Sequence, residues 1–268
     1  MTTIQKQLLA SPRNHRYILT VTAIILILFL WSLASVNLQD MNQNGFKIAL
    51  NILKGIFSPD LDLLFNVSKQ SVLFLLVQTA AIAFLGTIVG AILSIPLAFL
   101  AASNIVPKPI SWLTRLLLIV IRTIPALVYG LMFIRVSGPG PFAGVLTVCL
   151  TSIGMLSKLY VDAIEELDTR VLESMTSIGC TTLEKIRFGI FPQLLSVFLS
   201  VTIYRFDMNM REASILGLVG AGGIGAPLIF AMNSYKWSQV GSILIGLVIL
   251  ILIIEWMSNR IRTKLIKG

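Results

Sequence analysis

The stretch 168–192 reads DTRVLESMTSIGCTTLEKIRFGIFP, and it decides how the rest of the chain is interpreted. It is charged, it has the pattern of a helix, a glycine and a second helix, and it lies between two long apolar segments. A charged segment of this kind in an apolar chain predicts a docking surface for a soluble partner. An ordinary amphipathic connector between helices is the alternative.

Local signals mark the ends of both short helices. Asp168 or the threonine after it can cap the first helix, and Gly179 is placed to end it in the left-handed conformation. Thr181 and Glu184 have the spacing of a capping box, which starts a second short helix that Pro192 limits. The apolar side of the first helix consists of Val171, Leu172, Met175 and Ile178.

The composition is that of a membrane protein. Of the 268 residues, 56% are hydrophobic and only 12% are charged, whereas a soluble domain has about 25% charged residues. The mean hydropathy is +0.89. The net charge of +9 comes from basic residues at the ends of apolar segments, not from an aromatic-rich basic face, so no nucleic-acid partner is expected.

Six apolar segments can each cross a bilayer, which takes about 20 mainly apolar residues per helix. The sequence therefore predicts an all-α polytopic protein with six transmembrane helices, at about 17–36, 73–101, 117–136, 142–157, from 191 onward, and 237–257. The second helix extends beyond the bilayer or kinks near Pro96. Its Gly86 and Gly90 form a small-residue face for close helix packing.

The other segments divide the chain around a core at 73–257. Residues 1–16 and 258–268 form the tails, and residues 37–72 form a polar segment. Within that segment, the apolar residues of 46–57 recur at helical spacing, with lysines on the other face. This pattern predicts an interfacial helix or, equally, an external helix packed on the core.

Orientation follows from the distribution of lysine and arginine. The N-terminus and the 108–122 region carry three each, and the 158–187 segment and the C-terminus carry four each, fourteen in all. The opposite side carries five, with two further arginines counted as intramembrane. The excess places both termini and the charged segment in the cytoplasm, and residues 37–72 outside.

The charged segment resembles a conserved cytoplasmic loop of ABC importer permeases, the EAA loop. The resemblance rests on Glu173, on Gly179 six residues later and on Pro192 thirteen residues after that. The chain departs from the usual loop at four positions. Ser174 and Met175 replace alanines, and the usual Ile-x-Leu-Pro ending reads GIFP at 189–192.

Three further stretches resemble the phosphonate-type permease family: RTIPALV at 122–128, GPGPFAGVL at 138–146 and YRFDMNMREASILGLVGAGGIG at 204–225. The glycine stretch also resembles methionine importers. The likeness implies a type I ABC importer permease in the cell inner membrane, acting as a homodimer with two ATPase subunits and an extracytoplasmic binding protein. It also implies that the ATPase-coupling residues are Glu173, Ser174, Met175, Ile178, Gly179, Cys180 and Pro192.

The resemblance also implies a transport cycle. ATP binding closes the ATPases, draws the 168–190 helices together and turns the dimer outward, and the binding protein then releases phosphonate or a related phosphorus oxyanion into a path lined by the third to fifth spans. ATP and magnesium belong to the partner, because the chain has no P-loop. A methionine or other small-solute importer is the alternative. An ion-coupled secondary transporter ranks lower, since no internal repeat is found.

Four charged residues fall near the far end of the fifth predicted span, where an unpaired charge costs roughly a few kcal/mol. Asp207 and Arg211 are four residues apart and can pair. Arg205 and Glu212 are seven apart, on the same side of the helix but too distant for direct contact. The set is interpreted first as a structural network against the dimer mate, and second as an anion pathway.

Arg122 and Pro125 join this candidate set from the third predicted span. Arg122 is expected at the cytoplasmic entrance of the span, where it snorkels to lipid headgroups or contacts the dimer interface. A substrate contact ranks below both. Pro125, three residues after Arg122, is expected to kink the helix.

Five glycines lie within LGLVGAGGIGAP at 216–227. A dinucleotide site is rejected, because the GxGxxG pattern lies between membrane spans and the next acid is Glu255. A tight re-entrant or extracytoplasmic turn, packed against the other subunit and part of an outer gate, is the favoured interpretation, and an exposed flexible loop is the alternative. The candidate gate residues are Gly220, Gly222, Gly223 and Gly225.

No residue pattern indicates an enzyme. The sequence lacks a nucleophile with a base, a carboxylate pair in a pocket pattern and a His/Cys metal cluster, and Cys149 and Cys180 have neither metal-like nor disulfide-like spacing. The chain is therefore expected to hold no cofactor or metal of its own.

Overall fold

The computed structural model describes residues 15–35, 45–65 and 71–267, and every regular element in these ranges is helical. The chain divides into two compact units, residues 1–50 and 51–268, which are described separately.

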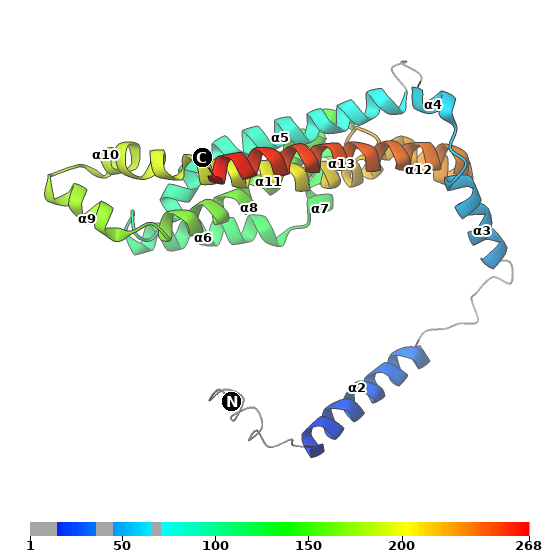
Figure 1. Cartoon of the computed structure of the whole chain (residues 1–268), viewed down its shortest axis with the longest axis horizontal. Helices are drawn as coiled ribbons and strands as arrows, with labels where there is room; N and C mark the ends of the chain where they lie inside the picture. The colour runs from blue at the N-terminus through cyan, green and yellow to red at the C-terminus, as the bar shows by residue number, and fades with distance from the viewer. Residues whose placement is uncertain (1–14, 36–44, 66–70, 268) are drawn as a thin grey trace. The chain divides into compact units, whose positions relative to one another are not determined.

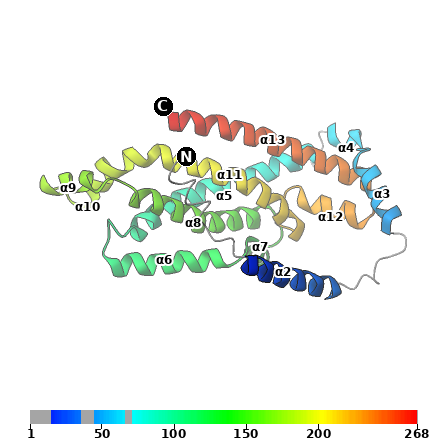
Figure 2. The same ribbon diagram turned by 60° about the horizontal axis from the view of Figure 1, so that its bottom comes forward.

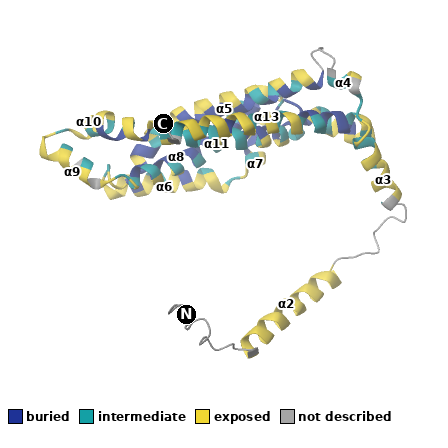
Figure 3. Ribbon diagram, viewed as in Figure 1, coloured by how far each residue is buried: buried dark blue, intermediate teal, exposed yellow. Residues whose placement is uncertain are grey.

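The first unit contains α2 (His15–Ser35), a helix of 21 residues that matches the first predicted span. Its residues 16–35 are all exposed (Figure 3). The predicted tail up to residue 14 and the start of the predicted polar segment, 36–44, lie outside the described residues.

The second unit is a bundle whose long helices lie side by side (Figures 1 and 2). Its elements are α4 (Leu61–Phe65), α5 (Val72–Ala101), α6 (Lys108–Thr123), α7 (Ala126–Ser137), α8 (Pro141–Glu165), α9 (Thr169–Ser177), α10 (Thr182–Glu184), the π-helical turn η2 (Lys185–Ile190), α11 (Phe191–Leu216), the 3₁₀ turn η3 (Gly217–Val219), α12 (Gly225–Asn233) and α13 (Trp237–Lys267).

Helices α5 and α8 pack against each other through small residues. A Cβ added at Gly86 would lie 2.6 Å from Val148 Cγ1, and one at Gly90 would lie 2.8 Å from Ser152 Cβ. Only glycine allows the two backbones to approach so closely, so the small-residue face predicted for the second span is confirmed. Helix α5 also continues through Pro96 without interruption.

The third predicted span, 117–136, is wrong as a single helix. Helices α6 and α7 are separated by an 86° bend. Ile124 is extended because the ring of Pro125 disfavours a helical conformation in the residue before it. The Tyr129 hydroxyl donates to the carbonyl of Ile121 across the break, at 3.1 Å. The sequence predicted a kink at the correct residue, Pro125, but it did not predict the size of the bend.

Two other helix ends differ from the prediction. Helix α8 continues beyond Ser157, where the fourth predicted span ends, to Glu165. The first residues of the 158–187 segment are therefore helical. The second coupling helix does not stop before Pro192, because α10, η2 and α11 form one helical path. The Phe191 amide bonds the carbonyl of Ile186, five residues back, and a proline is tolerated in the first turn of α11.

The fifth and sixth predicted spans begin where expected, at Phe191 and Trp237, and α13 continues past Met257. Helix α3 (Gly45–Ile56) confirms the predicted helix at 46–57 and crosses the boundary of the two units. A Cβ at Gly55 would lie 2.2 Å from Trp237 Cβ, so the end of α3 packs on α13. This contact supports a packed external helix.

Five described helices are long and apolar enough to cross a membrane, and the bent α6–α7 pair makes six if it counts as one span. The all-helical fold and the number of spans therefore agree with the sequence.

Candidate functional site

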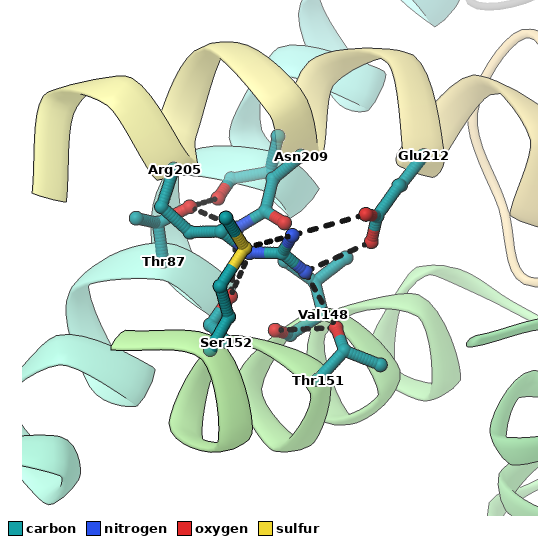
Figure 4. Close-up of polar contacts among 9 residues, drawn as sticks. Thr87, Val148, Thr151, Ser152, Arg205, Asn209 and Glu212 are labelled. Atoms are coloured by element: carbon teal, nitrogen blue, oxygen red, sulfur yellow. Dashed lines mark hydrogen bonds and ion pairs between the residues drawn. The ribbon is translucent and has the colours of Figure 1, made fainter. Parts of the chain in front are cut away.

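The charges of α11 form two separate groups. Arg205 is only 4% exposed, and its guanidinium forms two hydrogen bonds to the Glu212 carboxylate, at 3.0 and 3.1 Å (Figure 4). The prediction that these residues are too distant for contact is wrong. Seven residues rise about 10 Å along a helix, and the Glu212 side chain leans back toward the N-terminus, so the extended arginine spans the remainder.

Helix α8 supplies the other partners of Arg205. Arg205 Nη2 donates to Thr151 Oγ1 at 3.2 Å, and Arg205 Nε donates to Ser152 Oγ at 3.4 Å. Arg205 Nη1 contacts Met155 Sδ at 3.2 Å. All three nitrogens of the guanidinium are therefore occupied. The arginine holds α11 against α8 of the same chain, so the network is structural within one subunit, and its predicted role against the dimer mate stays a prediction.

A buried amide joins a further helix, α5, to this network. Asn209 is fully buried, and its Nδ2 donates to Thr87 Oγ1 on α5 at 2.7 Å and to Ser152 Oγ on α8 at 2.8 Å (Figure 4). The sequence analysis missed Asn209. The signal was an amide one helical turn from Arg205, on the side that also carries Glu212.

A cavity of about 270 Å³ lies beside this network, at the break between α6 and α7. It brings together four of the six residues proposed for the network or path, namely Arg122, Pro125, Arg205 and Glu212. The other two, Asp207 and Arg211, pair with each other at 2.7 Å, and Arg211 lies 3.9 Å from Glu255 of α13. The predicted i,i+4 pair is confirmed.

A further ion pair was not predicted. Arg115 of α6 binds Glu165 at the end of α8, and the same carboxylate accepts from the Ser103 amide at 2.8 Å. Arg115 Nε also donates to the carbonyl of Ala101 at 2.9 Å. These bonds tie the loop between α5 and α6 to α8. Sequence spacing gave no signal, because the two charges are 50 residues apart.

The coupling segment has the predicted caps. Asp168 caps α9 and accepts from the Arg170 amide. The hydrogen bonds from the Arg170 guanidinium, and then the bond from this amide, lower the pKa of the Asp168 carboxyl. Gly179 is left-handed, with φ of 81°. Thr181 and Glu184 form the capping box. The expected helix–glycine–helix therefore exists, although the second helix is continuous with α11.

Glu173 lies at a groove of about 250 Å³ between α9, the α10–η2 turn and the loop before α6. Its side chain is exposed, as are Ser174 and Ile178, whereas Met175 and Cys180 are half-buried. The groove is also lined by Asn104, Ile105, Thr176, Thr182, Lys185, Ile186 and Ile190.

Two departures from the usual loop compensate each other. A Cβ at Gly189 would lie 2.4 Å from Met175 Sδ, so the methionine occupies the space that a larger residue at 189 would fill. The usual loop has alanine and isoleucine at these positions. The large and small residues are thus on opposite sides of the contact between α9 and η2, compared with the usual loop.

The glycine segment is a compact, hydrogen-bonded turn. The Gly223 amide donates to Gln78 Oε1 at 3.1 Å and the Ile224 amide to Thr79 Oγ1 at 2.9 Å. Gly223 has a φ of 76°, and a Cβ there would lie 2.5 Å from that hydroxyl. The Gly140 amide donates to the carbonyl of Gly220 at 2.9 Å. The turn thus locks onto α5 and the start of α8, unlike an exposed flexible loop.

Comparisons with known proteins identify the family. The model described as "Binding-protein-dependent transport system inner membrane component" matches residues 94–266, more than half of the chain. The phosphate-import permease protein PhnE of Mycolicibacterium smegmatis is 36% identical over 70% of this chain and 36% of its own length. The phosphite transport system permease protein PtxC of Stutzerimonas stutzeri is 32% identical over 70% of this chain and 68% of its own. The chain thus spans about a third of the first relative and two thirds of the second.

Solved structures show the same fold. A chain of the MetNI methionine ABC transporter, in an inward-facing conformation, aligns with a TM-score of 0.63 at 19% identity, over 72% of this chain and 96% of that one. Members of the matched family act in ABC importers with ATPase subunits and a binding protein. The chain therefore belongs to the family of inner membrane components of binding-protein-dependent transport systems, as a multi-pass permease subunit of an ABC importer.

Proposed function

We propose that the chain forms a homodimeric permease that imports phosphonate or a related phosphorus oxyanion, driven by two ATPase subunits. The names of the relatives, which specify phosphate and phosphite, support this substrate class. Methionine has weaker support, because the likeness to the methionine transporter lies in the fold at 19% identity.

The coupling segment carries the proposal. The groove beside Glu173 has a capped helix on both sides, since Asp168 caps α9 and the capping box starts α10. Since α10, η2 and α11 are continuous, a movement of this groove passes directly into a membrane-spanning helix. An ATPase that holds Glu173 and Gly179 thereby moves α11 as it closes on ATP.

The remaining roles follow the same cycle. Both termini and the 168–190 helices face the cytoplasm, and the binding protein delivers substrate on the opposite side. The turn containing Gly220, Gly222, Gly223 and Gly225 forms part of the outer gate. Because hydrogen bonds anchor this turn to α5 and to the start of α8, it moves together with those helices.

Reconstituted complex tests the proposal through ATPase stimulation by binding protein loaded with phosphite or methylphosphonate. Glu173→Lys and Gly179→Asp are expected to lower stimulation or assembly at least about tenfold, since each places a new charge at a contact. Glu173→Gln and Gly179→Asn are the matched controls, and asparagine tolerates the left-handed backbone. Unchanged stimulation and assembly in both charged variants would show that the segment does not dock.

A further inference from the structure

Arg122 lies between two cavities. The first is the 270 Å³ cavity at the α6–α7 break, beside Arg205 and Glu212. The second, of about 260 Å³, lies between α6 and α8 and is lined by Arg115, Leu118, Ile119, Arg122, Lys158, Val161 and Asp162. Of the described residues, Arg122 alone lines both.

The position of Arg122 is fixed by its aliphatic stem. A Cβ at Gly154 of α8 would lie 2.7 Å from Arg122 Cγ and 3.2 Å from Ile121 Cγ2. The stem therefore lies on the bare backbone of α8, and the exposed side chain borders both cavities. The residue occupies the last turn of α6, which begins at Lys108.

The other two arginines at these cavities are already neutralised. Arg205 is held by Glu212, and Arg115 by Glu165. No ion pair of Arg122 occurs in the described part of the chain, and its guanidinium is therefore the uncompensated charge at the break. In a bilayer such a charge must face water or an anion.

We infer that Arg122 is the anion-contacting residue of the translocation path and passes an oxyanion between the two cavities. The inference rests on the proposed import function. The Arg205–Glu212 pair is then a neutral wall of the first cavity. At the cavity between α6 and α8, the charges of Lys158 and Asp162 offset each other, which leaves Arg122 as the net positive charge there.

The break itself suits this role. A discontinuous membrane helix is a recurrent feature of transport sites, because its backbone groups face a water-filled cavity. Ile124, Pro125 and Ala126 line the cavity, so the start of the 12-residue helix α7 also faces it. The volume of about 270 Å³ is many times the roughly 10–15 Å³ that a single water needs, so a small, partly hydrated oxyanion fits in it.

The same arginine has two simpler roles. Its charge favours the C-terminal end of α6 through the helix dipole, and its long side chain can reach lipid headgroups. Neither role makes uptake of an anion depend on the guanidinium separately from assembly of the protein. Transport and assembly therefore have to be measured together.

The test is uptake of radiolabelled phosphite and phosphate into proteoliposomes that contain the full complex and binding protein. Arg122→Met keeps the stem over Gly154 and removes the charge, and Arg122→Lys keeps the charge. Uptake is expected to fall about tenfold in Arg122→Met, the loss of one hydrogen bond to a charged group, and to recover partly in Arg122→Lys. Stimulated ATPase activity is expected to stay within about twofold, so that ATP is hydrolysed without transport. Arg135→Met is the matched control, since Arg135 is exposed in the last turn of α7 and lines neither cavity.

Each outcome has a separate meaning. If wild type imports neither phosphite nor phosphate, the proposed substrate class fails. If wild type imports them and Arg122→Met does so equally well, the inference is overturned. It is also overturned if uptake and ATPase activity fall together, because that result indicates a structural effect. The same holds if Arg122→Lys imports no more than Arg122→Met, or if Arg135→Met loses as much uptake. Those results indicate a headgroup contact or a general effect of charge.

Discussion

At the residue scale, Arg205 shows how a buried charge is stabilised within this bundle. Five polar contacts from Glu212 and α8 surround one guanidinium, which is 4% exposed. Removal of one partner from a buried ion pair leaves the other charge uncompensated, at a cost of about 3 kcal/mol or more. The pair therefore serves mainly to join α11 and α8.

We predict that Glu212→Gln lowers the thermal midpoint of the detergent-solubilised complex by about 6 °C or more, from that cost and about 2 °C per kcal/mol. The double variant Arg205→Met with Glu212→Gln is expected to lose less than the sum of the two single variants, by about 1–3 kcal/mol. Thermal unfolding of the four proteins measures this coupling. The pair Asp207–Arg211, in which the side chains are 14% and 46% exposed, is the more solvated comparison, with a coupling of about 0.5 kcal/mol. Equal coupling in both pairs would refute a special role for Arg205.

Sequence reasoning found these charges and one of their two ion pairs. The i,i+4 pair followed from helix geometry, whereas the Arg205–Glu212 contact depends on how far two long side chains extend. Asn209 and the Arg115–Glu165 pair needed the packing of separate helices, which the sequence does not contain.

At the element scale, the packing of α9 on η2 depends on one large and one small residue. We predict that Gly189→Ile disrupts this contact, because its side chain meets Met175, and overpacking costs about 1–3 kcal/mol. Adding Met175→Ala is expected to restore the contact, since the pair then matches the usual loop in volume. Co-purification of the ATPase subunit and the thermal midpoint measure both effects. If Met175→Ala with Gly189→Ile is no better than Gly189→Ile alone, the two positions are not coupled.

Helix existence was predictable at this scale, and helix continuity was not. Capping residues and apolar length gave the starts of α9, α10, α11 and α13. The effect of a proline depends on its surroundings: α5 continues through Pro96, Pro192 is accommodated beside the π-helical turn η2, and Pro125 produces an 86° bend. Composition around these prolines does not distinguish the three outcomes. Helix α12 was missed because its sequence follows directly on the glycine turn.

At the scale of the whole molecule, the positive-inside count predicts an orientation that the fold alone does not give. Helix α13 has 31 residues and is about 46 Å long, which exceeds the hydrocarbon core of about 30 Å. Its two ends must therefore emerge on opposite sides of the membrane. Which end of α13 faces the cytoplasm sets the orientation of the whole chain, and only one orientation brings the coupling segment to an ATPase.

We predict that a membrane-impermeant maleimide labels Lys236→Cys only in right-side-out vesicles, and Lys264→Cys and Lys185→Cys only in inverted vesicles. The background is a cysteine-free chain, with the two native cysteines replaced by alanine and serine. Lys236 precedes α13, Lys264 lies in its last turns, and Lys185 begins η2, so the three positions report on both ends of one span and on the coupling segment. Leu252→Cys, within the apolar part of α13, is the control and is expected to stay unlabelled in both preparations. Labelling of Lys185→Cys from outside would place the coupling segment away from ATP and would end the docking proposal.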